Sequence, residues 1–348
     1  MTGPCKFGHP LNDGRLDAVG VTLPFVTVIV TSYNYERYIT DCLESISGQS
    51  YRNFTCVVVD DCSTDGSVGA VERYAASEAA GGRFQLVRTA RNGGQMAAFK
   101  EGLRHARGSF VVLVDADDML LPDFLETHVQ AHLSRHTVAF TSSNQYQIDA
   151  VGEVVGGNHH DLQCQGEFRH VYQRTIYEPF WIWATTSSMM FRRSILDIII
   201  PANVQDFRIC ADNYVVHFAN LLGGSLLIPS IHGCYRRHGA NGFGANPVIG
   251  GHLPVGDMSK HPAHETVRRT ILLHLLDSRD ALLPIFTNGG FMNLVQRVAL
   301  PHEYPELKDR CPQAFPEPAR RYRLRHHKFV WMRRYWGIKG KIVRRFFS

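Results

Sequence analysis

The stretch that decides the fold is residues 111–118, Val-Val-Leu-Val-Asp-Ala-Asp-Asp, in which an apolar run ends in three carboxylates. A short, continuous run of Val and Leu is typical of a strand that is buried on both faces of a parallel sheet. Carboxylates without partners are costly in a core, but ligands bind in the crevice outside the carboxyl ends of such strands. The acids therefore predict an edge that holds a divalent cation and a ligand phosphate, or else simply the start of a loop.

Segments typical of strands and of helices alternate around this stretch. We expect strands at 25–31, 54–59, 84–87 and 110–114, and helices at 38–46, 66–74, 95–106 and 122–136. Such alternation implies parallel pairing through right-handed crossovers, and so an α/β fold, a layered domain with a mostly parallel central sheet. After residue 143 the pattern loosens, and we expect 144–180 to be a long excursion at one edge of the sheet. Further strands are expected at 185–191, 226–228 and 232–236, and helices at 212–222 and 262–300.

Composition divides the chain into four segments. They are an irregular segment with Gly and Pro at 1–24, the α/β domain at 25–242, a helical extension with a Pro-rich connector at 243–318, and a basic aromatic tail at 319–348. The chain has 348 residues, of which 44% are hydrophobic, so it can bury a sizeable core.

The same sequence bears on the cellular compartment. No apolar stretch reaches the ~20 residues that cross a bilayer, and residues 1–17 lack the basic and apolar regions of a secretory signal. The eight cysteines are scattered without a Cys-x-x-Cys pair, which argues against a zinc ribbon and favours reduced thiols. We therefore expect a cytoplasmic protein.

Positive charge is concentrated in the tail. The net charge of the chain is +5, yet residues 320–348 carry eleven Lys/Arg and no Asp/Glu. Five apolar side chains of the tail share one helical face: Trp331, Tyr335, Ile338, Ile342 and Phe346. Basic residues interleaved with aromatics can lie on an anionic membrane surface, where each charge adds about 1 kcal/mol. We favour peripheral attachment to the cytoplasmic face of the membrane, with packing on the domain second and nucleic acid a distant third.

Five ordered elements resemble family 2 glycosyltransferases with the GT-A fold. They are Val-Ile-Val-Thr-Ser-Tyr-Asn at 28–34, Val-Val-Val-Asp-Asp-Cys-Ser-Thr-Asp-Gly at 57–66, Asp-Ala-Asp at 115–117, Cys-Ala-Asp-Asn-Tyr at 210–214 and Tyr-Arg-Arg-His-Gly-Ala-Asn at 235–241. The resemblance implies a donor half at 25–143 and an acceptor half at 144–242. It also implies transfer of a sugar from a nucleoside diphosphate donor to an acceptor hydroxyl, with inversion, in polysaccharide or glycan biosynthesis.

The resemblance assigns the donor nucleotide sugar to Thr31, Tyr33, Asp61, Asp115 and Arg236. An aromatic ring can stack on a base and a carboxylate can accept a base N–H, although a packed Tyr33 and an N-capping Asp61 would look the same. Arg236 is either a bidentate clamp on the diphosphate or part of a solvated basic turn. One departure concerns Phe99, which stands where the family often has Arg, so we assign no diphosphate contact to that helix.

The implied metal ligands are Asp117 and His238. Mg²⁺ or Mn²⁺ prefers oxygen ligands and stabilises a diphosphate leaving group. Asp212 is the implied catalytic base, because a single displacement needs a carboxylate that takes the proton of the acceptor hydroxyl. Capping of the following helix is the other role that suits an Asp at this position.

Loop 144–184 is the candidate acceptor surface. Its Trp181 and Trp183 suit sugar rings, although two core tryptophans would look the same in sequence. The acceptor stays open between a glycan, a lipid-linked glycan and a protein. Two other functions stay open as well. One is a non-catalytic sugar- or nucleotide-binding module, and the other is a sugar-phosphate nucleotidyltransferase, whose Gly-rich basic signature is missing after the first strand.

Overall fold

The computed structural model describes residues 15–16, 21–134, 138–157, 168–238 and 263–310. The chain forms two compact units, of which the first comprises Met1–Arg174 and Pro179–Val267 and the second comprises Thr175–Glu178 and Arg268–Ser348. The predicted tail at 319–348 lies outside the described residues, as do 239–262 and most of 1–24. Among the described ranges, none of the helices has the length and apolarity needed to span a bilayer.

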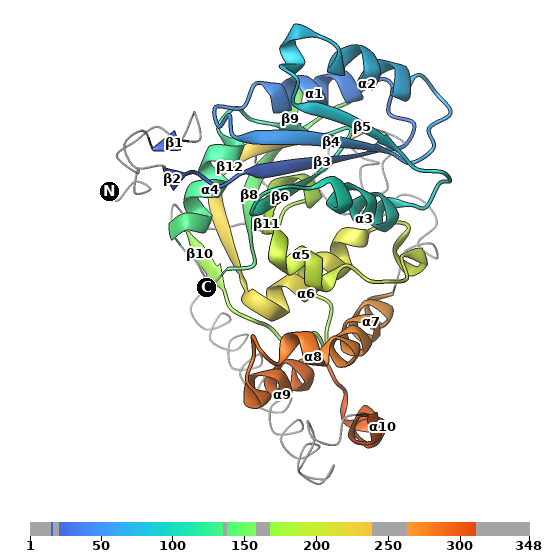
Figure 1. Ribbon diagram of the computed structural model, residues 1–348, viewed down its shortest axis with the longest axis vertical. Coiled ribbons are helices and arrows are strands. Elements are labelled where there is room, and N and C mark those ends of the chain that lie inside the picture. Colours follow the sequence, from blue (N-terminus) through green and yellow to red (C-terminus); the bar gives the residue numbers. More distant parts are fainter. Residues whose placement is uncertain (1–14, 17–20, 135–137, 158–167, 239–262, 311–348) are drawn as a thin grey trace, which may run out of the picture. The chain divides into compact units, whose positions relative to one another are not determined.

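A mixed sheet of ten strands forms the centre of the first unit (Figure 1). Its parallel part has the order β6-β3-β4-β5, built from β3 (Val26–Ser32), β4 (Phe54–Asp60), β5 (Phe84–Arg88) and β6 (Phe110–Asp115). β11 (Met189–Arg192) is antiparallel to both neighbours, β6 and β8 (Phe140–Ile148), and β12 (Ser225–Arg236) runs parallel to β8. The carboxyl ends of β3, β4 and β6 are therefore aligned along one edge.

Shorter strands complete the sheet. β7 (Met119–Leu120) and β10 (Arg169–Val171) pair with β12, and β9 (Val154–Gly156) pairs with β8. A separate pair consists of β1 (Arg15–Leu16) and β2 (Val21–Thr22). Short 3-10 turns occur at η1 (Glu78–Ala80), η2 (Thr186–Ser188) and η3 (Gln205–Phe207).

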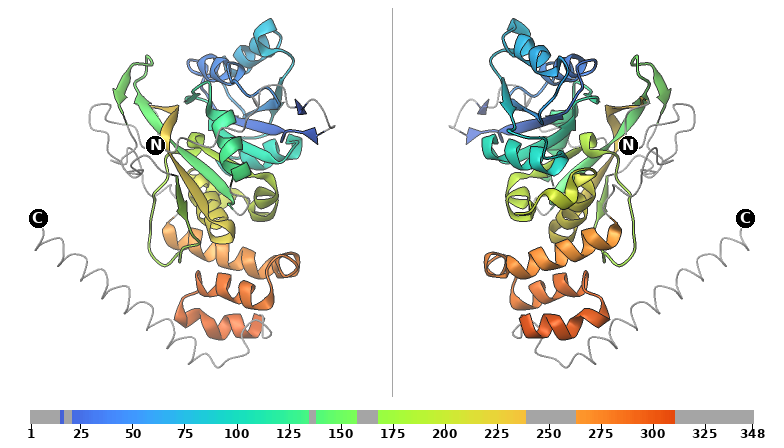
Figure 2. Two further views of the ribbon diagram at one scale, coloured as in Figure 1. Left: turned by 90° about the vertical axis from the view of Figure 1, so that its left-hand side faces the viewer. Right: turned by 90° about the vertical axis from the view of Figure 1, so that its right-hand side faces the viewer.

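Helices cover both faces of the sheet (Figures 1 and 2). α1 (Ile39–Ser47), α2 (Ser67–Ala75) and α4 (Phe124–Ser134) share one apolar core with β3, β4 and β6. α3 (Gln95–His105), α5 (Arg193–Ile199) and α6 (Ala211–Gly223) lie on the opposite face. α3 approaches β3 so closely that a Cβ at Gly102 would be 2.4 Å from Ile29 Cγ2, so this contact requires glycine.

The predicted layered α/β fold is confirmed, and every strand and helix expected between residues 25 and 136 is present. The expected edge excursion at 144–180 is wrong for residues 144–148, because β8 continues to Ile148 in the interior of the sheet, and residues 158–167 of that range lie outside the described residues. The strands expected at 226–228 and 232–236 are one bulged strand, β12, and the strand expected at 185–191 begins as η2.

The sequence does not predict β8 because the buried residues of this strand are polar. Residues 141–147 read Thr-Ser-Ser-Asn-Gln-Tyr-Gln, and most of them are fully enclosed. Partners compensate the burial: Thr141 Oγ1 lies 2.7 Å from His128 Nδ1, and the Ser142 and Ser188 hydroxyls are 3.0 Å apart. Buried polar groups are tolerated when they are hydrogen-bonded in this way.

The second unit is helical, which agrees with the helices expected at 262–300. Its helices are most of α7 (His264–Asp277), then α8 (Arg279–Leu282), α9 (Asn288–Gln296), η5 (Pro301–Glu303) and α10 (Tyr304–Arg310). The last two lie where a Pro-rich connector was expected.

A network of paired charges lies inside the second unit, and we call Arg268, Arg269, Glu303 and Glu306 the Arg268 cluster. Fully buried Arg268 donates to both carboxylate oxygens of Glu303, at 2.9 and 2.8 Å. Arg269 donates to Glu303 Oε1 at 2.9 Å and to Glu306 Oε1 at 2.9 Å. Each buried charge in this cluster therefore has a partner of opposite sign.

Candidate active site

Side chains from three elements converge at the carboxyl end of β6. Asp115 ends this strand, and its Oδ1 accepts hydrogen bonds from Thr31 Oγ1 on β3 at 3.3 Å and from Gln95 Nε2 on α3 at 3.1 Å. The backbone N–H of Asp115 donates to Ser187 Oγ in η2 at 3.0 Å. Two residues expected at the donor, Thr31 and Asp115, are thus in direct contact.

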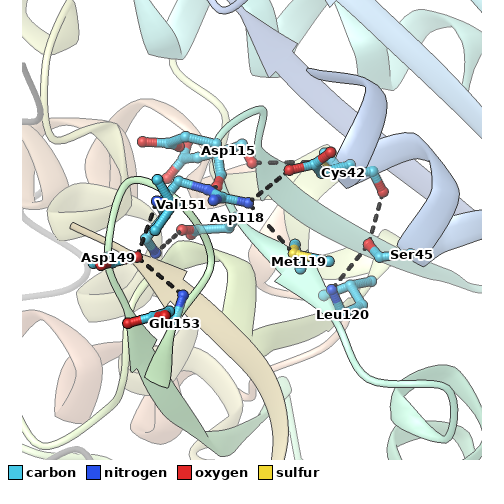
Figure 3. Close-up of polar contacts among 12 residues, drawn as sticks. Cys42, Ser45, Asp115, Asp118, Met119, Leu120, Asp149, Val151 and Glu153 are labelled. Carbon is cyan, nitrogen blue, oxygen red and sulfur yellow. Dashed lines mark hydrogen bonds and ion pairs between the residues drawn. The ribbon is translucent and has the colours of Figure 1, made fainter. Parts of the chain in front are cut away.

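The end of β12 contacts the acidic loop that follows β6, and Figure 3 labels Asp118 and Met119 of this loop. Arg236 N donates to Asp118 Oδ1 at 2.9 Å, and Arg236 Nε donates to Asp117 O at 2.8 Å. Just beyond the strand, His238 Nε2 lies 2.9 Å from Asp117 Oδ2. The two residues expected to bind metal therefore meet, although 121 positions separate them in the sequence.

The side chain of Arg236 does not face a ligand. It is 1% exposed, its Nη2 donates to Asp41 Oδ2 at 3.1 Å, and its guanidinium carbon lies 4.9 Å from the ring centre of Tyr38. The guanidinium is enclosed and bonded to Asp41 and to the Asp117 carbonyl, so the predicted contact of Arg236 with the donor stays a prediction that this geometry does not favour. Its role in this geometry is to hold the acidic loop against α1 and β12.

The carboxylates of this region repel one another, and we call Asp115, Asp117, Asp118 and Asp212 the carboxylate edge. Burial, followed by the charges of Asp117 and Asp212, raises the pKa of Asp115 to about 7. Burial and the charges of Asp117 and Asp115 hold the pKa of Asp118 well above its usual value. Carboxylate oxygens are the ligands that hard divalent cations prefer. In the part of the chain that is described, no three His, Cys, Asp or Glu side chains form a metal-binding group by themselves.

Asp212 lies in the first turn of α6. The helix begins after Cys210, which has a left-handed backbone (φ 54°) and provides no side-chain cap. Instead, the backbone N–H of Ala211 donates to Gln95 Oε1 at 2.8 Å. The Asp212 carboxylate accepts a hydrogen bond from Thr186 Oγ1 at 3.2 Å. The helix terminus is therefore fixed from α3, and Asp212 follows the N-cap position without occupying it.

Asp61 and Tyr33 follow β4 and β3 and differ in exposure. Asp61 is 4% exposed, and its Oδ1 accepts from Gly93 N and Thr89 Oγ1, both at 2.9 Å, while Oδ2 accepts from Gly94 N at 2.6 Å. The carboxylate thus organises the turn before α3 and does not act as an N-cap. Tyr33 is 45% exposed, so its ring is open to a partner.

The two candidate acceptor tryptophans differ as well. Trp183 is fully buried and its Nε1 donates to Ser225 Oγ at 2.8 Å, so the prediction that it contacts an acceptor is wrong. Its ring belongs to a core group with Phe140 and His217. Trp181 is half-buried, and its ring meets that of Trp183 edge-on. Only Trp181 of the pair therefore has surface to offer a sugar.

Sequence reasoning missed four residues that organise this region: Asp41, Gln95, Thr186 and Ser187. Asp41 is one of many acids on amphipathic helices, and Thr186 and Ser187 lie in an ordinary polar run. The Gly-Gly pair directly before Gln95 was the one available signal, because such a pair lets a backbone approach a neighbour closely.

Comparisons with known proteins agree with one another. Residues 27–199 match the profile of glycosyl transferase family 2. An uncharacterized glycosyltransferase of Nostoc sp. is 28% identical over 231 residues, which cover 62% of this chain and 66% of that protein. A putative teichuronic acid biosynthesis glycosyltransferase of Bacillus subtilis, TuaG, is 35% identical over 112 residues, covering 32% of this chain and 43% of that one. The chain therefore spans less than two thirds of the length of these relatives.

Among solved structures, that of S. aureus TarS 1–349 in complex with UDP-GlcNAc is similar in fold. The TM-score is 0.50 at 18% identity, over 88% of this chain and 92% of that chain. At this identity the likeness concerns the fold alone.

Proposed function

This chain belongs to glycosyl transferase family 2, and from that premise we propose that it transfers a sugar from a nucleoside diphosphate donor to an acceptor hydroxyl. The observation that carries the proposal is the carboxylate edge, where β6 ends at Asp115 and Asp117 Oδ2 lies 2.9 Å from His238 Nε2. This is the edge of an α/β sheet at which ligands bind. The mutual repulsion of these acids is relieved when a cation binds among them.

Asp117 and His238 would hold Mg²⁺ or Mn²⁺, with Asp115 beside them. A bound cation stabilises the negative charge that develops on a diphosphate leaving group. Sites for Mg²⁺ commonly use one or two carboxylates and take further ligands from substrate phosphates. A site of this kind agrees with the small number of candidate ligands here, since no three His, Cys, Asp or Glu side chains among the described residues form a metal-binding group.

Asp212 would act as the general base. In a single displacement, its carboxylate takes the proton of the acceptor hydroxyl while that oxygen bonds to the anomeric carbon and the nucleoside diphosphate leaves. Attack opposite the leaving group inverts the configuration. The hydrogen bond from Thr186 Oγ1 orients the Asp212 carboxylate for this step.

Other residues would bind the donor nucleotide, the acceptor and a membrane surface. Thr31, Asp61 and the exposed ring of Tyr33 would bind the donor nucleotide within the donor half, 25–143. Within the acceptor half, 144–242, Trp181 would contact a glycan acceptor, in keeping with a relative named for teichuronic acid biosynthesis. Attachment of residues 320–348 to an anionic membrane would be tested by pelleting the full and truncated chains with anionic liposomes.

The first experiment is a thermal-shift panel of UDP-, GDP-, dTDP- and CMP-sugars, each with Mn²⁺, Mg²⁺ or EDTA. A ligand that binds the folded state at a hundred times its Kd adds about 2.7 kcal/mol of stability. We expect one nucleotide class to raise the melting temperature, and EDTA to abolish the shift. Asp117→Ala should lose the metal-dependent shift, and a retained shift in this variant would contradict the metal role.

The second experiment separates catalysis from binding. Asp212→Asn should lower kcat about 10²- to 10⁴-fold, the usual contribution of a general base, and leave the donor-induced thermal shift in place. Asp197→Asn is the matched control, because this α5 aspartate is half-exposed and pairs with Arg193 on the surface. Donor binding without turnover in the wild type would instead indicate a binding module, and release of pyrophosphate from NTP and sugar phosphate would indicate a nucleotidyltransferase.

A further inference from the structure

We infer that Gln95 is a positioning residue that couples the donor-side carboxylate of Asp115 to the helix that carries Asp212. One amide group makes both contacts, since its Nε2 donates to Asp115 Oδ1 at 3.1 Å and its Oε1 accepts from Ala211 N at 2.8 Å. This inference rests on the proposed function, because it concerns the two halves of the same reaction.

The amide of Gln95 replaces a missing helix cap. The first N–H groups of a helix have no partner within it, and a side-chain oxygen of the N-cap residue normally accepts from one of them. In α6 the N-cap residue is Cys210, which makes no such bond. Gln95 Oε1 accepts from Ala211 N, and Asp212 Oδ1 accepts from Asn213 N at 2.8 Å, so the start of α6 and the position of Asp212 depend in part on a side chain from α3.

The turn before Gln95 fixes this side chain against the same segment. The backbone N–H of Gln95 donates to Arg208 O at 2.8 Å. Gly94 has a φ of +82°, and a Cβ there would lie 2.5 Å from Arg208 Cα, so only glycine permits the contact. The N–H groups of Gly93 and Gly94 are in turn held by Asp61. The turn thus joins three residues of the proposed site: Asp61, Asp115 and Asp212.

The orientation of the amide follows from its neighbours. A backbone N–H only donates, so the Gln95 oxygen must face Ala211, and the Gln95 nitrogen then faces Asp115 Oδ1. A substitution that keeps the Gln95 oxygen but removes its nitrogen donor should therefore keep the contact to Ala211 N and lose the contact to Asp115.

Two substitutions of Gln95 separate its contact with Asp115 from its contact with Ala211. Gln95→Glu keeps an oxygen toward Ala211 N but replaces the donor toward Asp115 with a second oxygen. Gln95→Met has similar length and removes both contacts. A hydrogen bond to a charged group contributes enough to expect changes of about tenfold or more.

The readouts are donor Kd, kcat with donor and acceptor saturating, and amide hydrogen exchange at the start of α6. Gln95→Glu should raise donor Kd about tenfold, with kcat and exchange near the wild type. Gln95→Met should raise donor Kd, lower kcat about tenfold and speed exchange at Ala211. Gln49→Met is the control for packing loss, because buried Gln49 bonds Leu121 O and Leu125 N; it should lower the melting temperature only.

Three results would overturn the inference. One is a Gln95→Met protein with wild-type donor Kd and kcat, and another is unchanged exchange at the start of α6. The third is a Gln95→Glu protein that matches Gln95→Met in every readout. Hydrogen exchange needs no substrate, so faster exchange in Gln95→Met beside a wild type without donor binding would refute the proposed function and leave only the structural contact.

Discussion

The carboxylate edge of the first unit and the Arg268 cluster of the second unit both include charged side chains that are buried, yet their charges are arranged in opposite ways. In the Arg268 cluster burial alone would raise the pKa of Glu303, but hydrogen bonds from Arg268 outweigh burial and lower it. At the carboxylate edge burial and like charges act together, and the pKa of Asp115 rises to about 7.

The difference separates a structural group from a ligand site. The buried charges of the Arg268 cluster already have partners of opposite sign within the fold, so they do not need a bound ion. Clustered charges of one sign lower the stability of the folded protein until an ion of opposite sign binds, and such perturbed groups are common at functional sites. Both clusters contain buried charged groups, Arg268 and Glu303 in one and Asp117 and Asp118 in the other, so burial by itself does not distinguish them.

The largest expected effect is on the paired cluster. Arg268→Ala should lower the free energy of unfolding by about 3–5 kcal/mol, because it leaves the enclosed Glu303 carboxylate without its main partner. Arg269→Ala is the control and should cost about 1 kcal/mol or less, since the Arg269 side chain is 34% exposed. Chemical denaturation measures both. Equal losses in the two variants would contradict the distinction between buried and exposed partners.

A smaller effect should appear in the pH dependence. In EDTA, the raised pKa of Asp115 means that the folded state binds more protons than the unfolded state, so stability falls as pH rises from about 5 to 7, by about 2 kcal/mol. The lowered pKa of Glu303 has the opposite sign, and its contribution is lost as pH falls below the usual carboxylate range. Hydrogen exchange resolved by unit would show the two trends. A first unit that gains stability between pH 5 and 7 without metal would break the comparison.

The smallest effect is expected for Asp118→Asn. Burial and neighbouring charges already favour the neutral form of Asp118, and Asn keeps an oxygen that can accept from Arg236 N. The free energy of unfolding should change by less than about 1 kcal/mol at pH 7. Thermal unfolding with and without Mn²⁺ checks this, and a loss as large as that of Arg268→Ala would mean that the Asp118 charge is paired after all.

The predictable part of the fold is the part whose strands are apolar. β3, β4 and β6 are recognisable from runs of Val with Ile or Leu, and the acids that end and follow β6 locate most of the carboxylate edge. β8 is not recognisable in this way, because its buried residues are polar, and the hydrogen bonds that Thr141 and Ser142 make cannot be read from the sequence.

The same reason applies to two of the predicted site residues, Arg236 and Trp183, whose partners within the chain are not visible in the sequence. Charge predicts that Arg236 binds an anion, but its anionic partner turned out to be Asp41 of the same chain, 195 positions away. Aromatic character predicts that Trp183 binds a sugar, but Ser225 and neighbouring rings enclose it. Residue chemistry is visible in the sequence, whereas the partner that uses it is a product of the fold.

The parallel pairing of β12 with β8 has a consequence for biosynthesis. Arg236 reaches back across 118 positions to Asp118, and contacts between such distant positions slow folding because a long loop must close first. A nascent chain that emerges at about 5–20 residues per second exposes the acids after β6 for several seconds before β12 exists. Asp117 and Asp118 are thus synthesised well before Arg236. A ribosome-bound chain that ends before Arg236 lacks the strand end that contacts these two residues.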